Sequence, residues 1–397
     1  MISSLRPGMF VSTPKSTRLT ALTLCLGMTG LSGCFRTIQP LTASPAEKGD
    51  LLAESRLWRQ KTSLAEARDR LSEALLSIDA SQGRLEKDIA HANRDKSWNL
   101  PDSIHSLPRR DRERTGIILV LGFNQKEGDK PKMVKLIVKE LRKRGWQASL
   151  VQLGEWGTPE ANAQAIDAHL RRELPKVDRA IAVGFSKGGD DWVHWVLGPA
   201  RSMPLAEREK IRVSLQFAPI LRGSAAAKWI TETKGPLGAY IRSKVRKTRE
   251  SHEDRRLEDV AAIANDPWVE HTVPPWREIL PHLTAVHFVA LPDDDKGLPS
   301  APSDFRLFSK LVAWGMPWSG PLDGLVESAA QVFPPGETTP QWVVRVRGSH
   351  ALLNGRYVQG GDRTSELYWE SEEEGWRGGL EMMDAFMRAF PRATVGW

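Results

Sequence analysis

Cysteine is scarce in this sequence, which contains only Cys25 and Cys34 among its 397 residues. Because both lie near the N-terminus, disulfide bonds cannot form a framework for the rest of the chain. The sequence also lacks internal repeats, low-complexity tracts and motifs for binding nucleic acid. With 40% hydrophobic and 26% charged residues, the composition is that of a globular protein. The length predicts one large α/β domain with additional segments.

Residues 1–33 have the pattern of a signal peptide. A basic start without acidic residues precedes an apolar segment at 19–31, which is too short to span a bilayer comfortably. The segment ends in Leu31-Ser32-Gly33-Cys34, which resembles a bacterial lipobox, in which the cysteine is lipidated and becomes the mature N-terminus. Met9 is an alternative start that would give a more typical signal length. An ordinary signal peptide with an incidental cysteine is the other interpretation.

Cleavage before Cys34 would change the chemistry of the mature chain. It would remove Cys25, so no internal disulfide could form even in an oxidising periplasm. It would also remove three basic residues and lower the formal charge from +7 to about +4, which is too mild an excess to indicate a membrane surface by itself. Phe35, rather than aspartate, follows the cysteine. By resemblance to sorting in Gram-negative lipoproteins, this predicts a lipid anchor in the outer membrane, facing the periplasm.

Residues 34–115 are predicted to form a tether and a helical extension. Apolar residues recur at every seventh position and indicate helix over about 51–93, with a break at 81–83; they are Leu57, Leu64, Leu71, Ile78 and Leu85. Such a heptad can form a coiled coil. Its second seam is interrupted by charged and polar residues, however, which favours a helix or helical hairpin packed on the following domain. Residues 94–115, including the charge run 109–114, are interpreted as a linker.

From residue 116 to 397, apolar strand-like runs alternate with helical patterns. This alternation predicts a mostly parallel sheet with helices on both faces. The expected strands are 117–121, 146–153, 180–183, 213–217, 286–291 and 342–346, and the expected helices include 133–144, 159–174 and 380–390. Residues 223–281 interrupt the alternation with a basic, tryptophan-containing segment. We interpret this insertion as a lid over a pocket, and a static cap is the alternative.

The stretch Gly184-Phe185-Ser186-Lys187-Gly188 stands between the strand at 180–183 and a helical pattern. Strand, G-x-S-x-G and helix in this order indicate a nucleophile elbow, in which the serine occupies a strained turn. The glycines are needed because side chains two positions from the serine would collide with the neighbouring strand and helix. The same turn directs the backbone N–H of Lys187 toward an oxyanion.

A nucleophilic serine needs a histidine base and a carboxylate that orients the histidine, in the chain order serine, acid, histidine. Of nine histidines, His350 is favoured because it follows the last strand in a loop. His194 falls on the helix after the elbow and His287 within a strand, so both are expected to pack in the fold. Asp323 is the favoured acid. The alternative is the run Asp293-Asp294-Asp295, which looks like a solvated loop or a weak cation site.

These motifs resemble the α/β-hydrolase superfamily, close to bacterial lipases and esterases, over residues 116–390. The Asp-Gly-Leu-Val stretch at 323–326 resembles the segment that carries the catalytic acid in lipases, and Pro219 to Ser224 resembles their Pro-x-x-x-Gly-Ser segment. Gly122-Phe123 stands where the family usually has His-Gly, so the resemblance implies the Phe123 N–H as a second oxyanion donor, although the residues depart from the pattern. It also implies an acyl-serine intermediate and no cofactor. Some such lipases bind structural calcium, but no site for it can be placed.

The sequence therefore predicts a membrane-anchored serine hydrolase that acts on a carboxylic ester or other acyl substrate. A thioesterase or acyltransferase that uses the same three residues is an alternative. A non-catalytic interaction lipoprotein on a hydrolase fold is another. The tryptophans around the insertion and the acid would suit an acyl pocket or a membrane-facing rim, whereas burial in the core explains most of them; they include Trp229, Trp268, Trp276, Trp314 and Trp318.

Overall fold

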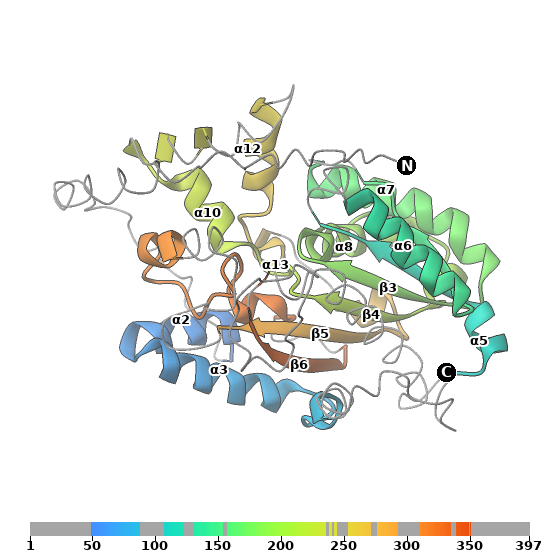
Figure 1. Ribbon diagram of the computed structural model, residues 1–397, viewed down its shortest axis with the longest axis horizontal. Helices are drawn as coiled ribbons and strands as arrows, with labels where there is room; N and C mark the ends of the chain where they lie inside the picture. The colour runs from blue at the N-terminus through green and yellow to red at the C-terminus, as the bar shows by residue number, and fades with distance from the viewer. Residues whose placement is uncertain are drawn as a thin grey trace, which may run out of the picture. The chain divides into compact units, whose positions relative to one another are not determined.

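The fold is built on one sheet of six parallel strands, in the order β2-β1-β3-β4-β5-β6 (Figure 1). The computed structural model describes residues 49–87, 107–122, 130–153, 157–235, 238–239, 242–243, 253–270, 276–292, 310–334, 339–348 and 350. The strands are β1 (Thr115–Val120), β2 (Gln147–Leu150), β3 (Arg179–Phe185), β4 (Ile211–Phe217), β5 (Thr284–Leu291) and β6 (Gln341–Arg347). All six predicted strands are confirmed within a few residues.

Both faces of the sheet are buried, as the near-continuous apolar strands require. On β1, Ile117 and Leu119 pack with α6 (Lys130–Lys143), while Ile118 and Val120 pack with α7 (Pro159–Glu173) and α8 (Lys187–Leu197). A third apolar cluster lies around β5 and β6, where the N-terminal helices meet the insertion. The prediction of helices on both faces is therefore confirmed. The predicted helix at 380–390 lies outside the described residues.

The strand order places a topological switch point between β1 and β3, because the chain runs from β1 outward to β2 and then crosses to the other side of β1. In parallel sheets, ligand sites form beyond the carboxyl ends of the strands at such a point. Gly122 follows β1 and Ser186 follows β3. The topology therefore brings the predicted nucleophile and the predicted oxyanion segment to the same place.

The insertion is mostly helical where the structure describes it. It contains α10 (Ala225–Glu232), α12 (Glu253–Ala262), α13 (Pro267–Glu270) and α14 (Trp276–Ile279). Other short elements are α5 (Arg109–Glu113), η2 (Leu174–Lys176), η3 (Pro199–Ser202), α9 (Leu205–Arg208) and η4 (Ser328–Gln331). No helix in these described segments is long and apolar enough to cross a bilayer.

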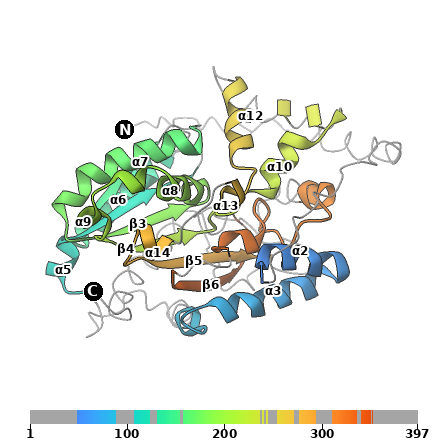
Figure 2. The same ribbon diagram turned by 180° about the vertical axis from the view of Figure 1, so that it is seen from behind.

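The N-terminal extension forms a helical hairpin of α2 (Leu51–Lys61) and α3 (Leu64–Ile78), which lies beside β5 and β6 in both views (Figures 1 and 2). Of the predicted helix or helical hairpin, the structure has the hairpin, and besides the turn at 80–83 the helix also breaks at Thr62-Ser63. Ser63 caps α3 by accepting from the Glu66 N–H at 3.1 Å, and Ser63 with Glu66 is a capping-box pattern that marks a helix start. The hairpin agrees with the intramolecular interpretation of the heptad.

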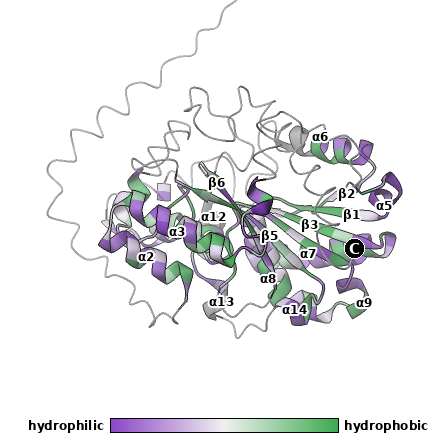
Figure 3. Ribbon diagram, turned by 90° about the horizontal axis from the view of Figure 1, so that it is seen from below, coloured by the Kyte–Doolittle hydropathy of each residue, from purple (hydrophilic) through white to green (hydrophobic). Residues whose placement is uncertain are grey.

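The heptad leucines do not form one seam. Leu71 is fully buried, but Leu57 and Ile78 are 44% and 39% exposed. Hydrophobic and hydrophilic residues accordingly alternate along both helices in Figure 3. The break at Thr62-Ser63 separates Leu57 from the rest of the pattern, and Ile78 is the last residue of α3, so no continuous seven-residue stripe forms.

The segment after α3 covers the edge strand of the sheet. Ala80 donates its N–H to the Gln341 carbonyl at 2.8 Å, and the buried Asp79 carboxylate accepts from the Val343 N–H at 3.0 Å. Glu86 forms an ion pair with Arg345 on the same strand. These contacts satisfy backbone groups that an open edge would expose.

Within the predicted linker 94–115, the charge run is not extended, because residues 109–113 form the short helix α5, directly before β1. Its Arg109 and Glu113 pair at positions i and i+4, which supports a short helix. The tether, the signal peptide and Cys34 lie outside the described residues.

Candidate active site

Ser186 stands on a strained turn between β3 and α8. Its φ of 54° lies in the left-handed region, which residues other than glycine rarely adopt. A β-carbon at Gly184 would lie 2.0 Å from Gln216 Oε1, and one at Gly188 would lie 2.1 Å from the Val120 carbonyl oxygen. Backbone therefore excludes a side chain at Gly188, as the sequence pattern predicted, whereas at Gly184 a side chain would require the Gln216 side chain to move.

The structure brings the three predicted residues together in one hydrogen-bonded chain. His350 Nε2 lies 2.7 Å from Ser186 Oγ, and His350 Nδ1 lies 2.7 Å from Asp323 Oδ2. The histidine also donates its backbone N–H to the Asp323 carbonyl at 2.9 Å. Asp323 is fully buried and His350 is 4% exposed. Acid and base are thus separated from bulk water, while the serine is partly accessible.

The Asp323 carboxylate is surrounded by hydrogen-bond donors. Its Oδ1 accepts from the backbone N–H groups of Leu325 and Val326 at 2.9 and 2.8 Å. Its Oδ2 accepts from Gln331 Nε2 at 2.8 Å, in addition to His350. These bonds compensate for the loss of water around a buried charge.

Sequence reasoning missed Gln331. Its own Oε1 accepts from the Ala290 N–H of β5 at 2.9 Å, which fixes the amide so that the NH₂ group faces Asp323. No local pattern marks this residue, because its role depends on a strand 41 positions away in the sequence.

The backbone around the predicted oxyanion site is close-packed. Lys187 is the first residue of α8, where the helix dipole favours negative charge. A β-carbon at Gly122 would lie 3.2 Å from the Lys187 nitrogen, so the end of β1 lies directly against the turn. The second predicted donor, Phe123, lies outside the described residues, as does the alternative acid run 293–295.

The Lys187 side chain is buried, which the sequence analysis did not anticipate. Its ammonium pairs with Asp191 one turn later, and Asn162 of α7 donates to the same carboxylate at 3.0 Å. Next to this pair, burial and the Asp191 charge hold the pKa of Asp190 well above its usual range. Neither Asp190 oxygen has a hydrogen-bond partner among the described residues. The Asn162 bond to Asp191 thus joins α7 to α8, and the Lys187 ion pair joins the start of α8 to the same carboxylate.

The histidines assigned to the fold lie where the sequence placed them. His194 is on α8, and His287 is fully buried on β5, where burial lowers its pKa to about 3. The described residues contain no group of three His, Cys, Asp or Glu side chains that could hold a metal ion.

Most of the singled-out tryptophans belong to the core. Trp229 and Trp276 are buried, Trp268 stacks on Trp276, and Trp318 lies beneath the Arg56 guanidinium. Trp314 is the exception, with 51% of its surface exposed.

Comparison with solved structures identifies the fold. A metagenomic carboxyl esterase matches 79% of this chain and 93% of its own, with 16% sequence identity and a TM-score of 0.50. A lipase from Bacillus licheniformis has 14% identity over 63% of this chain and 89% of its own, with a TM-score of 0.38. Carboxyl esterase 2 from Tuber melanosporum has 17% identity over 72% of this chain and 79% of its own, with a TM-score of 0.35.

No family model and no curated protein matches the chain. The sheet topology and the match to the metagenomic esterase show that the chain has the α/β-hydrolase fold, as its motifs predicted.

Proposed function

We propose that the protein is a serine hydrolase that cleaves carboxylic esters through an acyl-serine intermediate. The observation that carries the proposal is the chain of two 2.7 Å hydrogen bonds from Ser186 through His350 to Asp323. This is the arrangement in which a base removes the serine proton while a carboxylate orients the base. The metagenomic carboxyl esterase that shares this fold agrees with this reaction class.

In the proposed reaction, Ser186 Oγ attacks the ester carbonyl and His350 Nε2 takes the serine proton. The tetrahedral oxyanion accepts hydrogen bonds from the N–H groups of Lys187 and Phe123. His350 then gives the proton to the leaving alcohol, and the acyl-serine remains. Water, deprotonated by the same imidazole, attacks the acyl group and releases the carboxylic acid, which restores the serine.

The burial of the site supports this chemistry. Asp323 and His350 are nearly inaccessible, and in such surroundings the aspartate charge stabilises an imidazolium more strongly than it would in water. The strained serine turn supports it as well. Strain of this kind costs on the order of 1–3 kcal/mol and persists where the surrounding structure enforces it, often at functional sites.

We also propose that the protein is anchored to a membrane. Lipidation of Cys34 would anchor the chain, and Phe35 after it favours the outer membrane with the catalytic domain in the periplasm. The insertion at 223–281 would then act as a lid over the acyl site, since the start of α10 contacts the acid-bearing segment: Ser224 Oγ donates to the Leu325 carbonyl at 2.9 Å.

The proposed function is tested by labelling with a fluorophosphonate, which reacts only with an activated serine. The wild-type protein should be labelled, and Ser186→Ala should abolish both labelling and ester hydrolysis while the circular dichroism spectrum stays unchanged. His350→Ala should lower kcat by roughly 10⁴–10⁶, because the serine loses its base. Full hydrolytic activity in a folded Ser186→Ala preparation would refute the proposal.

A further inference from the structure

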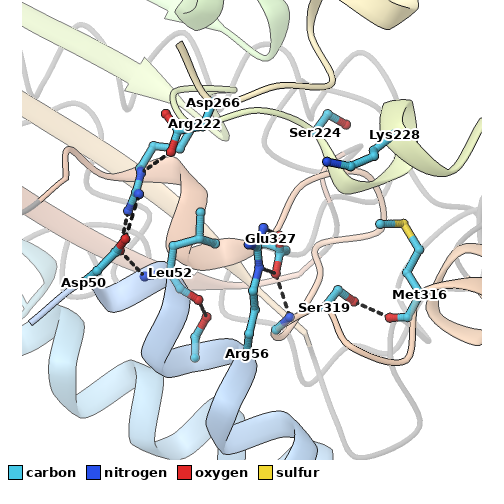
Figure 4. Close-up of polar contacts among 12 residues, drawn as sticks. Asp50, Leu52, Arg56, Arg222, Ser224, Lys228, Asp266, Met316, Ser319 and Glu327 are labelled. Atoms are coloured by element: carbon cyan, nitrogen blue, oxygen red, sulfur yellow. Dashed lines mark hydrogen bonds and ion pairs between the residues drawn. The ribbon is translucent and has the colours of Figure 1, made fainter. Parts of the chain in front are cut away.

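The first helix of the N-terminal extension reaches the segment that carries Asp323. Arg56 of α2 binds Glu327 through two nitrogens of its guanidinium: Nε lies 2.9 Å from Oε1, and Nη2 lies 2.6 Å from Oε2 (Figure 4). The two residues are 271 positions apart in the sequence. Such a two-point contact fixes the orientation of the carboxylate as well as its position.

Glu327 closes the base of the loop that holds the acid. Its Oε1 accepts from the Gly320 N–H at 2.7 Å, and its backbone pairs with Leu322 in an antiparallel bridge. Between the two sides of this bridge, the Asp323 N–H donates to the Val326 carbonyl at 3.0 Å, and Asp323 Oδ1 accepts two N–H groups of the loop. The position of the Asp323 carboxylate is therefore set by a loop whose ends Glu327 holds.

The helix also contacts the loop directly. A β-carbon at Gly320 would lie 2.6 Å from Ser55 Oγ, so α2 lies against the backbone at this point. The Arg56 guanidinium packs 5.5 Å above the centre of the Trp318 ring, just before the loop. α2 further contacts η4, which contains Gln331, the amide donor to Asp323.

Arg56 supplies the positive charge that balances the buried Glu327 carboxylate. The Glu327 side chain is 3% exposed, and Arg56 is its ion-pair partner across the interface. A buried carboxylate that loses its cation either draws in water or moves toward solvent. In both cases Gly320 and the ends of the acid loop lose their fixed partner.

We propose that Arg56 is a positioning residue for the catalytic acid, so that the N-terminal extension is a working part of the active site. This inference rests on the proposed function. Arg56 acts through Glu327 and the loop, and does not touch the reacting atoms. Because a misplacement of about 1 Å can lower a rate by roughly 10²-fold, its removal should lower kcat and leave KM unchanged.

A second ion pair of the same helix provides a matched control. Asp50, the residue that caps α2, binds Arg222, which is also paired with Asp266 (Figure 4). This pair attaches α2 to the segment after β4 and shares no hydrogen bond or ion pair with Glu327 or Gly320. Asp50→Asn removes the negative charge and keeps a side chain that can cap the helix.

The experiment compares Arg56→Met, Arg56→Lys and Asp50→Asn in the full-length chain. We would measure kcat and KM per active site counted by end-point fluorophosphonate labelling, the second-order labelling rate constant, and Tm. Arg56→Met should lower kcat and the labelling rate 10- to 100-fold at unchanged KM. Asp50→Asn should lower Tm without changing either rate. Arg56→Lys keeps the charge but not the two-point contact, so its kcat should fall between those of wild type and Arg56→Met.

Adding Glu327→Gln to Arg56→Met provides the rescue. The amide oxygen can still accept from Gly320, and no buried charge is left, so part of the lost kcat should return. Wild-type kcat per active site in Arg56→Met, with a lowered Tm as in Asp50→Asn, would overturn the inference and leave Arg56 as an anchor only. If Arg56→Met does not fold, wild-type kcat in Arg56→Lys would overturn it equally. Absence of labelling in the wild type would instead refute the proposed function.

Discussion

Replacing Asp323 by Asn should change the tautomer of His350, and the surrounding hydrogen bonds determine how. Asp323 Oδ1 accepts from two backbone N–H groups, those of Leu325 and Val326. An Asn NH₂ group at this position would face two donors, and each unsatisfied buried group costs about 1–3 kcal/mol. The Asn oxygen must therefore take the Oδ1 position, and the NH₂ group must replace Oδ2.

At the Oδ2 position the NH₂ group faces His350 Nδ1 and the Gln331 amide. Gln331 cannot turn its side-chain oxygen toward the Asn NH₂ group, because that oxygen accepts a hydrogen bond from the Ala290 N–H. The imidazole must then accept at Nδ1, which puts its proton on Nε2. In this tautomer Nε2 cannot take the Ser186 proton, so Asp323→Asn should lower kcat by roughly 10²–10⁴, about 3–5 kcal/mol in activation free energy.

The assay is steady-state hydrolysis of a p-nitrophenyl ester, together with the fluorophosphonate labelling rate. The ¹⁵N chemical shifts of the His350 ring, assigned with His350→Ala, should report the change of tautomer directly. Asp295→Asn is the matched control and should behave as wild type. Activity of Asp323→Asn within tenfold of wild type, or a large loss in Asp295→Asn, would refute the assignment of the acid.

Two further predictions concern stability and anchoring. His287 is fully buried with a pKa of about 3, so the unfolded chain binds a proton that the folded chain does not, and stability is lost as the pH falls below 6.5. Between pH 7 and pH 5 this amounts to about 2 kcal/mol, and His287→Phe should flatten that part of a chemical-denaturation pH profile; an unchanged slope would contradict the reasoning. Mass spectrometry of the mature N-terminal peptide should find an acylated Cys34, and Cys34→Ala should leave the membrane fraction; an unmodified chain that begins elsewhere would exclude the lipid anchor.

The sequence alone determined the fold class and the three residues of the proposed site. Buried parallel strands must be apolar on both faces, so the runs at 117–121, 180–183 and 213–217 were recognisable without any partner. The turn at Ser186 requires glycines two positions on either side, which is a local demand written in five residues. The order Ser186, Asp323, His350 follows from the order of the strands whose ends carry them.

The tertiary structure decided what depends on distant partners. Gln331 is a site residue only because the Ala290 N–H fixes its amide. Arg56 reaches Glu327 across 271 positions, and neither residue has a local pattern that distinguishes it from an exposed charge. The exposure of Leu57 and Ile78 likewise depends on how the two helices of the hairpin pack on the rest of the chain. Short-range patterns report on backbone geometry and on which face is apolar, whereas the pairing of particular side chains is fixed only when the packed elements bring them together.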